Sequence, residues 1–300
     1  MTKMHADEVH TDAALVRRLL AAQFPQWADL PIERFPSPGT VNAVYRLGDD
    51  FSVRLPLVEG GVEDVTKEQE WLPRLAPLLP VAVPEALGTG VPGEGFPWPW
   101  TVCRWLPGAN PQAGRLSDAE SMAADLAAFV TAFRRVELPG GPRAYRGGPL
   151  TAVDRATRRA IGELDGLIDT AAATAAWDAA VRTPEWAGPP VWVHSDLMPG
   201  NLLVENGRLT GVIDFATAGV GDPACDLIAA WNLLPEHARG VFRAALDADD
   251  DTWARGRGWA LSMALIQLPY YQHTNPAIAA NARHVIHEVL TDMTAETPLG

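Results

Sequence analysis

A short β-type segment, residues 191–215, constrains the fold of this 300-residue chain more than any other feature. It contains the dipeptide Asn206-Gly207, which strongly favours a two-residue hairpin because both central positions of a type I′ turn need a positive φ. Folding at that turn brings the two ends of the hairpin, Asn201 and Asp214, to the same mouth. The chain must therefore accommodate a tight antiparallel hairpin inside a region whose other segments have helical periodicity.

The rest of the chain divides near residue 108 into a β-rich part, 1–108, and a mostly helical part, 109–300, which predicts an α+β fold. The first part is expected to hold a helix capped by Asp12, a helix around 62–78, and strands at 32–35, 41–47, 51–55 and 98–106. The second part is expected to hold a helix capped by Ser117 and helices at 152–167, 171–181, 224–234, 236–246, 252–268 and 277–293.

Charge and composition exclude several classes of protein. There are 24 basic and 37 acidic residues, so the net charge is −13, which argues against nucleic acid as the main partner and is compatible with a cationic ligand. Two cysteines, Cys103 and Cys225, make no disulfide framework and indicate a reducing compartment. Neither a signal peptide nor a membrane-spanning run is recognisable, so we expect a cytoplasmic protein with no membrane partner.

Three oxygen-bearing side chains converge on the hairpin mouth. Asn201 and Asp214 are suitable ligands for Mg²⁺, which takes few protein ligands and completes its shell with water and phosphate oxygens. Asp196 lies five residues before Asn201 and would accept a proton from an attacking hydroxyl. A base and an Asn in one loop, followed by a metal-binding Asp, are typical of phosphoryl transfer in kinases.

The series His194-x-Asp196-x4-Asn201, followed by Ile213-Asp214-Phe215, resembles the catalytic loop and metal motif of the aminoglycoside phosphotransferase family. The resemblance implies a protein-kinase-like two-lobe fold and transfer of the γ-phosphoryl group of ATP, with Mg²⁺, to a hydroxyl of a small molecule. It also implies that Asp196 is the catalytic base, that Asn201 and Asp214 are magnesium ligands, and that His194 supports the loop. That family usually has Gly after the His, whereas this chain has Ser195.

A second motif follows the hairpin. Asp222 with Pro223 at the first helical position predicts an N-cap, and Asp226 lies one turn further on. A carboxylate on a largely apolar helix needs hydrogen-bond donors. By the resemblance, Asp226 accepts backbone N–H groups of the catalytic loop and so has a supporting role.

The β-rich part is expected to bind the nucleotide. Gly39 and Asn42 lie in the loop between two strands where the resemblance implies a cover over the ATP phosphates. In kinases a strand lysine contacts the α/β-phosphates and pairs with a helix Glu. Here the matching position is Arg54, and Glu68 is its expected partner, with Glu70 and Glu63 as competitors.

The acceptor is left open by the sequence. An aminoglycoside-like antibiotic is favoured, and the alternatives are a macrolide or a metabolic alcohol. A nucleotide-binding pseudokinase is the rival from another class, and it rests only on Arg54 and Ser195. His284 and His287 share a helix face, but no third ligand is in sight, so a zinc site is not expected.

Overall fold

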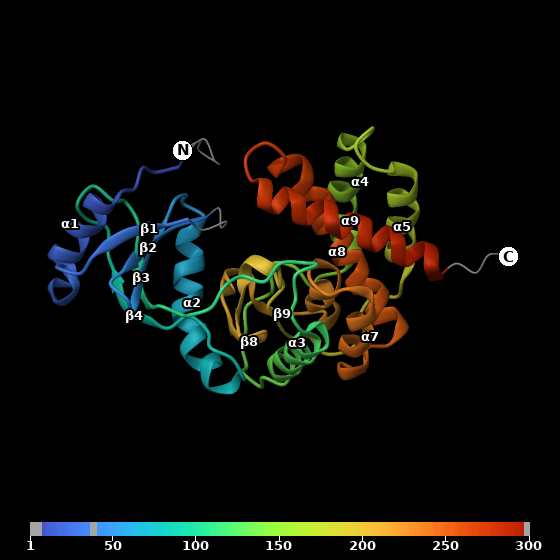
Figure 1. Ribbon diagram of the computed structural model, residues 1–300, viewed down its shortest axis with the longest axis horizontal. Coiled ribbons are helices and arrows are strands. Elements are labelled where there is room, and N and C mark those ends of the chain that lie inside the picture. The colour runs from blue at the N-terminus through green and yellow to red at the C-terminus, as the bar shows by residue number, and fades with distance from the viewer. Residues whose placement is uncertain (1–7, 37–40, 297–300) are drawn as a thin grey trace. The chain divides into compact units, whose positions relative to one another are not determined.

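The computed structural model describes residues 8–36 and 41–296 (Figure 1). The chain forms two compact units. The first comprises residues 1–77, 82–108 and 211–216, and the second comprises 78–81, 109–210 and 217–300. The short piece 211–216, which contains Asp214, thus belongs with the β-rich unit although it follows the hairpin of the helical one.

A five-stranded antiparallel sheet forms the first unit, with strand order β1-β2-β3-β5-β4. Its strands are β1 (Ile32–Phe35), β2 (Asn42–Leu47), β3 (Phe51–Pro56), β4 (Ala86–Gly90) and β5 (Trp100–Arg104). Four of them agree with the sequence predictions. Strand β4 was not predicted, because its sequence, Ala-Leu-Gly-Thr-Gly, has few of the β-branched and aromatic residues that favour strands.

The core of this unit lies between the sheet and helix α1 (Ala13–Gln23). Asp12 caps the helix by accepting the N–H of Leu15 at 2.7 Å, as predicted. The helix buries four aliphatic side chains against strand residues such as Tyr45 and Trp100: Leu15, Val16, Leu19 and Leu20. Full burial of side chains of this size stabilises the fold by about 1.5–3 kcal/mol each.

Helix α2 (Gly61–Leu75) also belongs to the first unit. Its buried positions recur at helical spacing and include Val65, Glu68, Leu72 and Leu75. The prediction extended this helix to residue 78, but the last three residues form a 3-10 turn. Glu68 is the one charged side chain among the buried positions of α2, so it needs a partner inside the fold.

The second unit is mostly helical. Its helices are α3 (Ala119–Arg134), α4 (Asp154–Glu163), α5 (Thr170–Arg182), α6 (Ala229–Asn232), α7 (Glu236–Ala245), α8 (Asp250–Tyr271) and α9 (Pro276–Glu296). Figure 1 shows α8 and α9 running against each other in this unit. Much of α8 is buried around its circumference, as expected for a central helix.

Three helix predictions for this unit are corrected. The N-cap of α3 is Asp118, not Ser117, because the Asp118 carboxylate accepts the Ser121 N–H at 2.9 Å. The predicted helix 152–167 is a 3-10 turn (Leu150–Val153) followed by α4, which ends before Gly166 turns the chain with a φ of 75°. The predicted helix 224–234 begins as a 3-10 helix, Pro223–Ile228, and only its end, α6, is α-helical.

Two small sheets frame the segment that the sequence singled out. Strands β7 (Leu202–Glu205) and β8 (Arg208–Val212) form the predicted hairpin, and Asn206 and Gly207 have φ values of 51° and 78°. Strand β6 (Val191–Val193) pairs with β9 (Gly219–Gly221), which was not predicted. Among the described residues, no helix is both long and apolar enough to span a membrane.

Candidate functional site

The loop after β6 is fixed by a buried carboxylate. Asp226 accepts the backbone N–H groups of His194 at 2.9 Å and Ser195 at 2.8 Å. Burial raises the pKa of Asp226, while His194, the two N–H donors and Arg134 act in the opposite direction. The structure thus contains the contacts that the resemblance implied for Asp226, and they clamp the start of the loop.

Ser195 occupies the position where the family usually has Gly. Its φ is 64°, in the left-handed region that Gly adopts readily and that costs other residues about 1–2 kcal/mol. The Ser195 hydroxyl donates to the carbonyl of Thr217 at 2.9 Å, and the Thr217 hydroxyl donates to the carbonyl of His194 at 2.8 Å. The serine is therefore accommodated with one hydrogen bond, from its hydroxyl to Thr217, that a glycine cannot make.

Asp196 is held by two side chains. The amide Nδ2 of Asn201 donates to Asp196 Oδ2 at 3.0 Å and to the Asp196 carbonyl at 2.9 Å. Arg146 donates through Nη1 to Asp196 Oδ1 at 3.0 Å and to the carbonyl of Ser195 at 3.1 Å. The Asp196 side chain keeps 18% of its surface exposed. The carboxylate is thus oriented from both oxygens and still reaches the solvent.

Sequence reasoning missed Arg146. It lies in a Pro/Gly-rich stretch, 139–149, that carries no recognisable motif. The available signal was the pair of glycines in β9, Gly219 and Gly221, which indicates a close backbone approach.

In the first unit, Asp214 lies in a short segment whose backbone is hydrogen-bonded to side chains of α2. Asp214 has a φ of 65°, and the following residue, Phe215, donates its N–H to Glu68 Oε1 at 3.0 Å. Lys67 Nζ donates to the carbonyl of Ala216 at 2.8 Å. Neighbouring residues of α2 thereby fix the backbone immediately after Asp214.

The expected partner of Arg54 is Glu68, and neither Glu70 nor Glu63 takes its place. Arg54 Nη1 lies 2.8 Å from Glu68 Oε2 in a largely buried ion pair. Burial is the largest single influence and opposes the charge of Arg54, but Glu68, Cys103 and Asp214 together outweigh it, so the pKa of Arg54 lies above its ordinary value. Arg54, Glu68 and the Phe215 N–H therefore form one continuous network.

The remaining nucleotide-site predictions have different outcomes. Gly39 lies outside the described residues. Asn42 begins β2, and its Oδ1 is buried without a hydrogen-bond partner among the residues that the structure describes.

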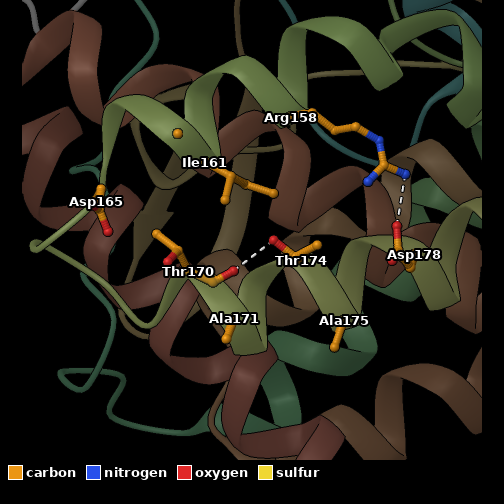
Figure 2. Close-up of a pocket in the computed structure, with 9 residues that line it drawn as sticks. Arg158, Ile161, Asp165, Thr170, Ala171, Thr174, Ala175 and Asp178 are labelled. Atoms are coloured by element: carbon orange, nitrogen blue, oxygen red, sulfur yellow. Dashed lines mark hydrogen bonds and ion pairs between the residues drawn. The ribbon is translucent and has the colours of Figure 1, made fainter.

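The described residues also line a hollow of about 690 Å³ between α4 and α5, and none of the predicted site residues is part of its lining. Figure 2 shows Arg158 of α4 and Asp178 of α5 bridging it in an ion pair of 2.7 Å. Small side chains, including Ala171 and Ala175, make up much of the wall. This hollow lacks the acid, amide and arginine constellation of the Asp196 loop. In the described part of the chain, no three or more His, Cys, Asp or Glu side chains gather as a ready metal cage.

An antiparallel sheet carrying a buried Arg–Glu pair, together with a helical unit carrying an Asp–Asn loop, defines a protein-kinase-like architecture. The chain belongs to the phosphotransferase enzyme family, whose sequence profile matches residues 32–259. The family and the α+β fold predicted from the sequence are thereby confirmed.

Individual relatives are more distant. An aminoglycoside 3'-phosphotransferase from Escherichia coli is 40% identical over 60 residues, which are 20% of this chain and 22% of that protein. The uncharacterized protein YcbJ of Bacillus subtilis (strain 168) is 34% identical over 76 residues, which are 25% of this chain and 23% of that protein. The matched segments thus span less than a quarter of either relative.

Solved structures show the same fold over nearly the whole chain. The GDP and kanamycin complex of APH(2")-IIia has a TM-score of 0.75 at 19% identity, covering 92% of this chain and 98% of that one. The macrolide 2'-phosphotransferase MphH from Brachybacterium faecium has a TM-score of 0.62 at 22% identity, with coverage of 92% and 97%. At these identities the likeness concerns the fold.

Proposed function

We propose that this protein transfers the γ-phosphoryl group of ATP to a hydroxyl group of a small molecule. The hydroxyl oxygen forms a bond to the γ-phosphorus, and the bond from that phosphorus to the β,γ-bridging oxygen breaks, with its electron pair leaving on ADP. The hydroxyl proton passes to Asp196 and then to solvent. The observation that carries this proposal is the Asp196 carboxylate, held by Asn201 and Arg146 yet partly exposed.

The roles of the other residues follow from their chemistry. Arg54, kept charged by Glu68, would contact the α/β-phosphates in place of the usual lysine, and it binds phosphate through a planar fork. Gly39 and Asn42 would belong to the cover over the phosphates. His194 and Asp226 would support the loop that carries Asp196.

The donor set fits magnesium. Asn201 uses its amide nitrogen on Asp196, so its Oδ1 is the atom left for a cation, and Asp214 supplies a carboxylate. These are hard oxygen donors of the kind that Mg²⁺ prefers, and few are needed because water and phosphate complete its shell. When bound, the ion would neutralise charge on the nucleotide phosphates.

An aminoglycoside-like antibiotic is the acceptor we propose first. The net charge of −13 favours a cationic ligand, and the Escherichia coli relative is an aminoglycoside 3'-phosphotransferase by name. A macrolide and a metabolic alcohol remain the alternatives for the screen. Two observations favour an active enzyme over the pseudokinase alternative: Arg54 makes the expected ion pair with Glu68, and the loop accommodates Ser195.

The test is ADP release with ATP or GTP as donor, measured across aminoglycosides, macrolides and metabolic alcohols. With the acceptor that is turned over, Asp196→Asn should lower kcat about 10²–10⁴-fold and leave nucleotide affinity nearly unchanged. Asp214→Asn should instead abolish the magnesium dependence of nucleotide binding, as measured by titration calorimetry with and without Mg²⁺.

Asp165→Asn is the matched control, since it makes the same change at an exposed residue of the α4–α5 hollow and should behave as wild type. Wild-type turnover by Asp196→Asn would contradict the base assignment. Nucleotide binding without turnover of any acceptor would instead favour the pseudokinase.

A further inference from the structure

We propose that Arg146 is a positioning residue for phosphoryl transfer, acting through Asp196. This inference rests on the proposed function. Neither the sequence motifs nor the family resemblance contains Arg146, which lies 50 residues before its partner along the chain. The inference follows from how the fold delivers the guanidinium to the carboxylate.

The segment 142–147 is built onto the edge of β9. The Val220 N–H donates to the Pro142 carbonyl at 2.8 Å, and the Ala144 N–H donates to the Val220 carbonyl at 3.1 Å. Beyond Arg146, the carbonyl of Gly147 accepts the Asp222 N–H at 2.8 Å. Backbone hydrogen bonds on both sides of Arg146 therefore fix where its side chain starts.

Two glycines permit this approach. A Cβ atom at Gly219 would lie 2.5 Å from backbone atoms of Pro142 and Ala144, and one at Gly221 would lie 2.8 Å from the Gly147 carbonyl oxygen. No side chain fits at such distances without moving the backbone. The sequence of β9 is thus suited to holding the Arg146 segment against the sheet that leads into the catalytic loop.

Arg146 and Asn201 together orient the carboxylate of Asp196. Arg146 holds Oδ1 while Asn201 holds Oδ2, so the plane of the carboxylate is set from two directions. The same Nη1 atom also binds the Ser195 carbonyl, which ties the carboxylate to the strained backbone position before it.

A purely structural role accounts poorly for these contacts. The Arg146 side chain is 21% exposed, and its Nη1 atom donates to Asp196 Oδ1 and to the Ser195 carbonyl of the same loop. An arginine that served only to stabilise the 142–147 segment would not need to contact Asp196, the proposed base.

The experiment measures kcat and KM for ATP and for the acceptor in Arg146→Gln and Arg146→Lys, with thermal unfolding recorded for each. Arg146→Gln should lower kcat about 10- to 100-fold, as expected for a hydrogen bond to a charged group, with little change in KM for ATP. Arg146→Lys should recover part of the loss, because it restores a positive charge and a donor. The double variant Arg146→Gln/Asp196→Asn should be no slower than Asp196→Asn, because the two residues act as one unit.

Arg143→Gln is the control, because it removes the same charge from an exposed position of the same segment and should retain wild-type kcat. The inference is overturned if folded Arg146→Gln has the kcat of Arg143→Gln, or if Arg146→Lys has no higher kcat than Arg146→Gln. It is also overturned if the double variant is slower than Asp196→Asn by the whole factor that Arg146→Gln costs alone. An active Asp196→Asn would instead contradict the proposed function, so the two failures are distinguishable.

Discussion

Replacing Asp226 by Asn should loosen the loop that carries Asp196 without changing its shape, and the size of the effect follows from the contacts. The Asp226 carboxylate is fully buried and accepts two backbone N–H groups, from His194 and Ser195. An Asn side chain keeps one acceptor oxygen and turns an NH₂ group toward the other N–H. The variant therefore loses one charge-assisted hydrogen bond and strands a buried donor.

The two losses are worth about 1.5–3 and 1–3 kcal/mol, respectively. Removing a buried charge offsets part of this loss of stability, since burial itself disfavours the ionised carboxylate. We therefore expect Asp226→Asn to lower the free energy of unfolding by about 2–4 kcal/mol. Catalysis should fall as well, because Ser195 would no longer be held in its left-handed conformation next to Asp196.

Urea unfolding followed by tryptophan fluorescence measures the first effect, and kcat with the identified acceptor measures the second. Ser195→Gly provides the matched background, because Gly adopts the positive φ without cost and should make the loop less dependent on Asp226. The reasoning is refuted if Asp226→Asn has the urea midpoint and kcat of wild type, or if it is equally damaging with Ser195 and with Gly at that position.

The remaining predictions concern two ion pairs, Arg54–Glu68 and Arg208–Asp125. Arg54→Ala should leave the buried Glu68 carboxylate without its partner and destabilise the fold by about 3–5 kcal/mol. Its steady-state turnover should fall strongly while Arg54→Lys keeps substantial activity, and an Arg54→Ala enzyme that behaves as wild type would show that the nucleotide-site alignment is wrong. Asp125 accepts hydrogen bonds from Arg208 and the Leu209 N–H, and the Arg208 contact lowers the pKa of Asp125 below its ordinary value of 3.8. A carboxyl group whose pKa is lower in the folded than in the unfolded state stabilises the fold at pH values above its unfolded-state pKa. This contribution is lost as the pH falls toward the folded-state pKa. The difference in unfolding free energy between wild type and Asp125→Asn should therefore be full near neutral pH and shrink below about pH 4, and a difference that grows on acidification would contradict this sign.

Local chemistry in the sequence determined the parts of this protein that lie within a few residues of one another. Asn206-Gly207 specified the hairpin because few residues tolerate two consecutive positive φ values, and Asp12 specified the start of α1 through its own side chain. The spacing of Asp196, Asn201 and Asp214 around that hairpin was readable for the same reason. Where local signals were weak, as in the glycine-rich strands β4 and β9, the predictions missed the element.

Only the tertiary structure decided which distant groups meet. Glu68, and not Glu70 or Glu63, faces Arg54 because the rotation of α2 on the sheet selects one helix face. Arg146 reaches Asp196 because the backbone of 142–147 pairs with β9, and main-chain pairing is nearly independent of side-chain identity. A contact made through the backbone between remote segments leaves almost no mark on the sequence, apart from the glycines that must make room for it.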